Sequence, residues 1–229
     1  MKKLAKDCYR NKDFNKAITI YKTLLGKQIE FLGEYNDDTL TTLHELGISC
    51  IEINNYDGAI FYLHDLLRKY ISLFGEDNFA VITTKLNIAN CFGNKKKYNE
   101  AIQYFEEVVV KLSNTLGPTH IFTLRTMHYY TMCYIRMENF DAVIPMQEKL
   151  VEDLINRCNQ LGAKDKYAMV SVENLAIAYM GKARYNEALP LLESLLEIET
   201  STLGPDDKYT LATKNQLDKC KNYMDITTS

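Results

Sequence analysis

Four histidines and six cysteines are the residues of this 229-residue chain best suited to nucleophilic catalysis or metal binding. They form no C-x-x-C motif and no Cys/His cluster, so the spacing typical of a zinc site is absent. The sequence also contains no glycine-rich phosphate loop, no H-E-x-x-H motif and no G-x-S-x-G elbow. These observations predict a protein that is not an enzyme and that uses no metal or organic cofactor.

A short Leu-Gly or Phe-Gly pair shows how the chain is organised. Successive pairs are 42, 42, 45 and 42 residues apart and end at Gly33, Gly75, Gly117, Gly162 and Gly204. An aromatic residue followed by Asn or Asp keeps nearly the same period, beginning at Phe14, Tyr56, Tyr98, Phe140 and Tyr185. Two independent markers with one period indicate an array of repeats.

The apolar residues of each repeat follow helical spacing in two separate segments. A first helix is expected near 39–53, 81–94, 123–137, 168–182 and 210–224. A second helix is expected near 15–31, 57–74, 99–115, 141–160 and 186–202. We expect Asp57 to cap a second helix and Gly33 to end one in a left-handed conformation. No repeat alternates with the period of a β-strand, so the chain is predicted to be all-α.

Small residues recur at one place in each helix, where they would let neighbouring helices approach closely. In the first helices they are Gly47, Ala89 and Ala176, with Thr131 as the exception. In the second helices they are Ala17, Ala59, Ala101 and Ala188, with Val143 as the exception. The cysteines also follow the repeat, so we interpret them as small packing residues in a reducing compartment.

Ala89, Phe92 and Ala101 form a pattern of a small residue, an aromatic residue and an alanine that Ala176, Tyr179 and Ala188 repeat. This pattern resembles the tetratricopeptide repeat family, and the resemblance covers nearly the whole chain. The 42-residue period and the Leu-Gly-Pro connectors at 116–118 and 203–205 are similar to the long repeat of kinesin light chains. The resemblance implies a right-handed superhelical α-solenoid of antiparallel helix pairs, with about 11 helices.

We expect one array over residues 1–229. It would comprise a truncated first repeat at 1–32, full repeats at 33–74, 75–116, 117–161 and 162–203, and a capping helix at 204–229. Leu4, Ala5 and Cys8 would occupy buried positions of the truncated repeat. The three extra residues of the 45-residue step would either lengthen a helix or turn, or change the local curvature of the superhelix.

Charge and hydropathy limit the class of partner. The net charge of -3 argues against a nucleic-acid-binding protein, and Lys95-Lys96-Lys97 is expected to be a solvated loop. No uncharged apolar stretch reaches the length of a membrane span, and residues 1–7 have no apolar signal region. We therefore expect a cytoplasmic protein with no nucleic-acid or membrane partner.

In the tetratricopeptide repeat family the first helices line a concave groove that holds extended peptides or helices. The resemblance places nine residues of this chain in such a groove: His44, Glu45, Asn87, Asn90, Arg125, His128, Tyr129, Arg136 and Asn174. Asn87 and Asn174 match an asparagine that grips the ligand backbone, because an amide both donates and accepts hydrogen bonds. Solvated asparagines explain the same residues equally well.

The two arginines leave a similar choice. Arg125 and Arg136 could pair with carboxylates of a ligand, or form surface salt bridges to residues such as Glu138. Tyr129 follows Arg125 by one helical turn, where the two-carboxylate clamp of chaperone-binding repeats has a basic residue. Recognition of a chaperone tail is therefore not expected.

The sequence favours a non-enzymatic module or scaffold that binds a peptide or helix of a partner protein. One alternative is a structural spacer or assembly subunit that uses its convex face and open ends, including end-to-end self-association. Another is a regulatory segment of a larger multidomain protein.

Overall fold

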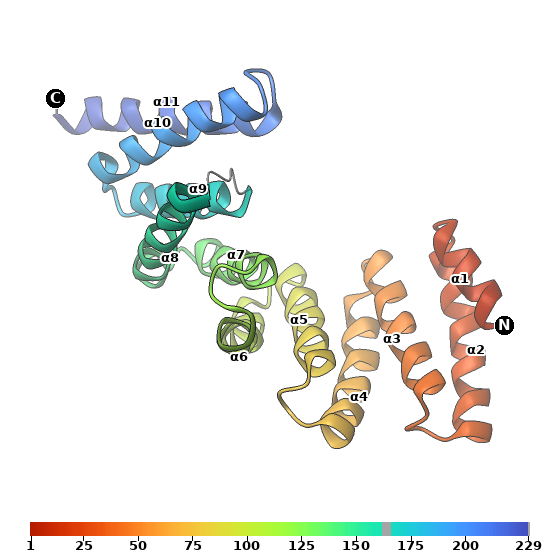
Figure 1. The fold of residues 1–229 in the computed structure, drawn as a ribbon. Coiled ribbons are helices and arrows are strands. Elements are labelled where there is room, and N and C mark those ends of the chain that lie inside the picture. Colours follow the sequence, from red (N-terminus) through yellow and green to blue (C-terminus); the bar gives the residue numbers. More distant parts are fainter. Residues whose placement is uncertain (162–165, 229) are drawn as a thin grey trace. The chain divides into compact units, whose positions relative to one another are not determined.

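The computed structural model describes residues 1–161 and 166–228, and this part of the chain contains eleven α-helices and no strand (Figure 1). The helices are α1 (Lys2–Arg10), α2 (Phe14–Leu32), α3 (Asp37–Glu52), α4 (Tyr56–Phe74), α5 (Phe79–Asn94), α6 (Tyr98–Leu116), α7 (Ile121–Arg136), α8 (Phe140–Leu161), α9 (Lys166–Gly181), α10 (Tyr185–Thr202) and α11 (Lys208–Thr228). The expected all-α fold and the number of helices are confirmed.

The chain divides into two compact units, Met1–Lys111 and Leu112–Ser229, and the boundary falls inside α6. In the first unit α1 packs on α2, α2 on α3, α3 on α4 and α4 on α5. In the second unit α8 packs on α9, α9 on α10 and α10 on α11, and α7 contacts both α8 and α9. From α1 to α5 and from α7 to α11, consecutive helices therefore pack on one another, as expected for stacked helical hairpins.

The small residues identified from the repeat lie at the centre of this packing. Ala17, Ala59, Ala101, Ala188 and Val143 of the second helices are all fully buried. Ala89, Ala176 and Thr131 of the first helices are buried in the same way. A Cβ atom added to Gly47 would lie 2.9 Å from Cδ2 of Leu63, which shows how closely α3 approaches α4. The prediction that these positions permit close helix packing is confirmed.

The helix ends differ in detail from the sequence-based expectation. Gly33 follows α2 with φ 89° and ψ 164°, so its φ is positive but its ψ is extended, and the expected left-handed helical cap is wrong. The cap of α4 is Asn55, whose side chain accepts a hydrogen bond from the Gly58 amide, and Asp57 instead lies in the first turn. Asn54, the residue before this cap, has a positive φ of 57°.

The 45-residue step lengthens a helix. Helix α8 has 22 residues, whereas α2, α4 and α6 have 19 each. Pro145 and Pro190 are each the sixth residue of their helices, α8 and α10, which is just beyond the first turn. The repeat glycine Gly162 lies outside the described residues.

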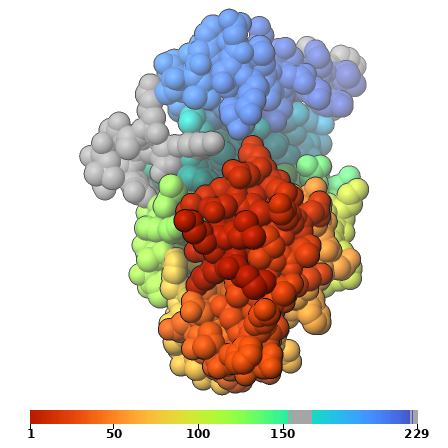
Figure 2. Space-filling model, turned by 90° about the vertical axis from the view of Figure 1, so that its right-hand side faces the viewer, coloured from red at the N-terminus to blue at the C-terminus, as the bar shows by residue number. Residues whose placement is uncertain are grey.

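Two other expectations concern the surface. Ala5 and Cys8 of α1 are buried, but Leu4 is 54% exposed, so its expected burial is wrong. Its helix belongs to the red segment that faces the viewer in Figure 2. Lys96 and Lys97 are exposed in the α5–α6 turn, and Lys95 forms an ion pair with Asp57. Among the described helices, none has the length and hydropathy needed to cross a membrane.

Candidate interaction surface

The first helices of the repeats carry all nine residues expected to face a ligand. In the first unit α3 carries His44 and Glu45, while α5 carries Asn87 and Asn90, and all four are half-buried. Asn87 and Asn90 are three residues apart, so their side chains share one face of α5. Burial lowers the pKa of His44, although the adjacent Glu45 opposes this shift.

Glu45 also influences two tyrosines on the preceding helices. Burial raises the pKa of Tyr21 to about 12, and the negative charge of Glu45 contributes to this shift. Tyr9 donates a hydrogen bond to Glu52, with 3.3 Å between the hydroxyl oxygen and Oε1. Burial, followed by the charge of Glu52, raises the pKa of Tyr9. The α3 face thus combines carboxylates with phenol groups from α1 and α2.

In the second unit the structure brings two of the expected residues into contact. Nδ2 of Asn174 on α9 lies 3.3 Å from Nδ1 of His128 on α7. An amide nitrogen can only donate, so this contact is a hydrogen bond when Nδ1 of His128 carries no proton. Burial lowers the pKa of His128, which favours the neutral form. Asn174 is only 2% exposed, so its amide group lies at the buried side of this contact.

The other three residues lie on α7. The guanidinium carbon of Arg125 lies 5.1 Å from the ring centroid of Phe122, within range of a cation–π contact. Tyr129 is 42% exposed, and its ring centroid is 5.5 Å from that of His128. Arg136 is exposed at the last residue of the helix. The α7 face therefore presents a cation, a phenol and a neutral imidazole.

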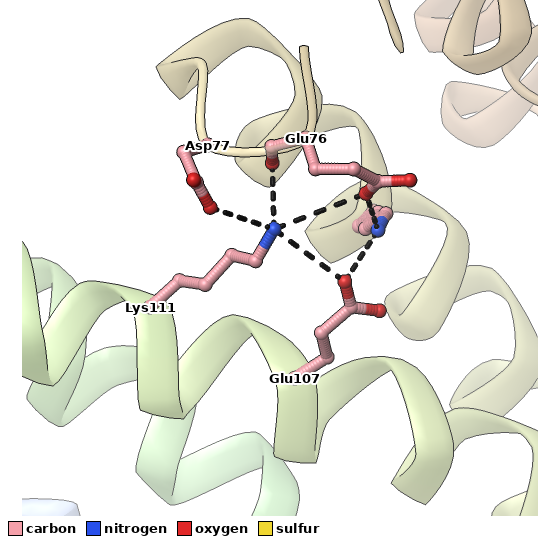
Figure 3. Close-up of polar contacts among 5 residues, drawn as sticks. Glu76, Asp77, Glu107 and Lys111 are labelled. Atoms are coloured by element: carbon pink, nitrogen blue, oxygen red, sulfur yellow. Dashed lines mark hydrogen bonds and ion pairs between the residues drawn. The ribbon is translucent and has the colours of Figure 1, made fainter.

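Sequence reasoning missed a cluster of ion pairs around the buried Lys85 in the first unit; Figure 3 shows four of its members, Glu76, Asp77, Glu107 and Lys111. The ammonium of Lys85 on α5 lies 2.7 Å from Oε2 of Glu76 and 2.5 Å from Oε1 of Glu107. Lys111 on α6 lies 3.1 Å from Oδ1 of Asp77 and donates to the Glu76 carbonyl at 2.7 Å. These contacts tie the α4–α5 connector to α5 and α6.

The charges of this cluster compensate one another. Burial alone would lower the pKa of Lys85, but hydrogen bonds to Glu107 and Glu76 raise it overall. The hydrogen bond from Lys85 lowers the pKa of Glu76. Lys85 stays charged, and both lysines are paired with carboxylates, so the cluster acts as an internal clamp on the connector rather than as a ligand site.

The signal for this clamp was present in the repeat. Lys69, Glu34 and Asp65 precede Lys111, Glu76 and Glu107 by 42 residues each, and Lys69 pairs with Glu34 at 3.2 Å and Asp65 at 2.7 Å. In the second unit the residue after the glycine is proline at positions 118 and 205. Ion pairs thus hold the connectors of the first unit, whereas two connectors of the second unit contain proline.

Comparison with known proteins identifies the family. The sequence profile described as tetratricopeptide repeat matches residues 1–72, 80–154 and 169–207, which is most of the chain. The chain belongs to the tetratricopeptide repeat family. Repeats of this family generally mediate protein–protein interaction, and a comparison with curated proteins finds no significant match.

Solved structures agree on the fold of this tetratricopeptide repeat protein. One is a crystal structure of nearly identical TPR-like repeats from a candidate kinesin light chain of Podosopora anserina, with a TM-score of 0.75 and 20% identity. The match covers 87% of this chain and 93% of that one. Another is BtubC (BKLC) from P. vanneervenii, with a TM-score of 0.71, 18% identity, and coverage of 88% and 79%. Both matches show that this chain shares the fold of these TPR-like repeat structures.

Proposed function

We propose that this tetratricopeptide repeat protein is a non-enzymatic interaction module that binds an extended peptide or a helix of another protein. The ligand contacts the faces of the first helices. The observation that supports this most directly is the α7 face, where Arg125, His128 and Tyr129 place a cation, an imidazole and an exposed phenol within two helical turns. Aromatic and arginine side chains of this kind dominate binding energy in protein interfaces.

The first helices of each unit offer their own chemistry to a ligand. In the first unit the amides of Asn87 and Asn90 can each donate to and accept from a peptide backbone. In the second unit Arg125 and Arg136 supply positive charge, and His128 lies beside the amide of Asn174. A ligand with at least one carboxylate suits the arginines of the second unit.

The test is affinity capture from native lysate with mass spectrometry, using the full chain. Asn87→Ala and Arg125→Ala should each lose the captured partners. Asn99→Ala and Arg68→Ala are matched controls, because they change the same residue types at exposed positions of the second helices α6 and α4. If the control variants lose the partners while the first-helix variants keep them, the assignment of the binding face is wrong.

Self-association is a second candidate, favoured by the exposed Met1 and Leu4 of the α1 end. Sedimentation velocity over a hundredfold range of protein concentration should then show association that Leu4→Glu abolishes. A monomer at every concentration would remove this candidate.

The proposal also includes a cytoplasmic location. Its support is that the five described cysteines are buried and carry free thiols, as is usual in a reducing compartment. Fractionation of cells that express the tagged chain would test it, and recovery in a secreted or organelle fraction would contradict it.

A further inference from the structure

A small pocket in the second unit lies among α9, α10 and the start of α11. Its volume is about 330 Å³, at the lower end of the range for small-ligand pockets. Its walls are largely apolar and are formed by Met169, Val170, Leu203 and Tyr209. A volume of this size suits one long side chain or one small organic molecule.

Three carboxylates complete the lining: Glu173 from α9, Glu199 from α10 and Asp207 at the start of α11. Glu173 accepts a hydrogen bond from Nε2 of Gln216 at 3.2 Å, and Asp207 accepts one from the Tyr209 amide at 2.8 Å. Among the described residues that line the pocket there is no lysine or arginine. The pocket therefore gathers negative charge that its own described lining does not neutralise.

Glu199 is the residue that most needs a partner. It is 6% exposed, and its Oε2 atom is buried without a hydrogen-bond partner among the described residues. Its carboxyl group receives one hydrogen bond, from Thr213. A buried carboxylate with an unsatisfied oxygen is costly, and a cation brought beside it would remove that cost.

The electrostatics of the pocket agree with this view. Burial, followed by the negative charges of Glu173 and Asp207, raises the pKa of Glu199 despite the hydrogen bond from Thr213. The same three carboxylates that repel one another would all attract a positive group placed between them.

We propose that this pocket binds an ammonium or guanidinium group carried on an alkyl stem, with Glu199 as its buried counter-charge. The stem packs against Met169, Val170 and Leu203, and the cation lies among the three carboxylates. This chemistry occurs in the lysine and arginine side chains of a partner protein and in free diamines. The pocket shares helix α9 with the first-helix face described above, but none of the nine residues assigned to that face lines it. Its test uses small cations alone, so the two proposals can fail separately.

The experiment is a titration of the full chain with defined probes, followed by calorimetry and by amide NMR shifts of Val170, Thr202 and Asp207. The probes are Nα-acetyl-lysine methylamide, cadaverine, and Nα-acetyl-norleucine methylamide as a neutral analogue of the lysine probe. A cationic probe should saturate and shift these amides, while the norleucine probe should not. Tighter binding of the blocked lysine would indicate a protein side chain as the natural ligand, and tighter binding of cadaverine a free diamine.

Variants locate the site. Glu199→Gln should weaken binding of the better cation about tenfold or more, because it removes the buried charge and keeps the shape. Glu197→Gln is the matched control, since Glu197 is exposed on the same helix and does not line the pocket. Glu173→Gln provides a second variant with a half-buried residue, in case Glu199→Gln fails to fold. Any of three results would overturn the proposal. They are a norleucine probe that binds as tightly as the lysine probe, unchanged cation affinity in both pocket variants, and no saturable binding of either cation.

Discussion

At the scale of single residues, buried polar groups decide what each helix face can offer. Asn174 is expected from the resemblance to bind the backbone of a ligand. In the structure its amide group also contacts the imidazole of His128. Glu199 and Lys85 show the opposite outcomes of burying a charge, since Lys85 has two carboxylate partners and Oε2 of Glu199 has none among the described residues.

The state of His128 can be measured directly. Because burial favours the uncharged imidazole, its pKa in the folded chain should lie below the ordinary value of about 6.5. A depressed histidine pKa contributes stability that is present above the unfolded value and is lost as pH falls through the folded value. NMR titration of the imidazole should give this lower pKa.

Asn174→Ala provides the comparison for this titration. Loss of the amide donor to Nδ1 should move the pKa of His128 upward, because that hydrogen bond stabilises the neutral form. A wild-type pKa at or above the ordinary value would contradict the assignment.

Sequence reasoning located the residues of the candidate site but not their partners. The spacing of the repeats places Asn174 and His128 on first helices. Their contact depends on how α7 and α9 pack, and this packing cannot be read from the spacing. In the sequence, Glu199 cannot be distinguished from the other acidic residues of its helix. It is buried because α9 and α11 surround it in the fold. Roles in ligand binding for the nine expected residues remain predictions.

At the scale of helices, the sequence repeat predicts the structure better than it predicts contacts between single residues. All ten expected segments are helices, because apolar spacing and small packing residues recur in every repeat. The errors occur at helix ends, at the N-terminal cap of α4 and at Gly33 after α2. There the conformation of one or two residues determines how the helix begins or ends, and apolar spacing does not predict that conformation. The sequence does not explain why threonine replaces a smaller residue at position 131. In the structure Thr131 accepts a hydrogen bond from the buried Gln147 at 2.6 Å.

Glycines inside two helices should respond oppositely to alanine. Glycine in a helix interior ordinarily costs about 1 kcal/mol relative to alanine. Gly26 of α2 has nothing within 4 Å of an added Cβ, so Gly26→Ala should raise the free energy of unfolding by about this amount. At Gly47 the added Cβ meets the fully buried Leu63 at 2.9 Å, so Gly47→Ala should lose this gain or destabilise the fold.

Urea denaturation of both variants and the wild type measures the difference. Helix propensity alone predicts equal gains, so the comparison isolates the contact between α3 and α4. A stabilisation by Gly47→Ala as large as that by Gly26→Ala would show that the two helices are not packed as closely as described.

At the scale of the whole molecule, stability is distributed along the chain. Consecutive helices pack on one another from α1 to α5 and from α7 to α11, and the boundary between the two compact units falls inside α6. In such proteins stability is approximately a sum of local and nearest-neighbour contributions. A defect in one unit should therefore be felt mainly by that unit.

Hydrogen exchange can test this locality. Leu63 of α4 and Leu192 of α10 are both fully buried, and truncation of such a leucine to alanine typically costs about 2–5 kcal/mol. Leu63→Ala should lower amide protection mainly in α3–α5, and Leu192→Ala mainly in α9–α11. Equal loss of protection in both units for either variant would show that the chain unfolds as one cooperative body.

The two kinds of connector imply that the units differ in their response to ionic strength. In the first unit Glu34 and Glu76 hold the connectors through lysines, and added salt screens such pairs, with a Debye length of about 8 Å at physiological ionic strength. In the second unit Pro118 and Pro205 restrict the backbone without any charge. Added salt should therefore weaken the ion pairs at the connectors of the first unit more than it affects the two proline-containing turns of the second unit.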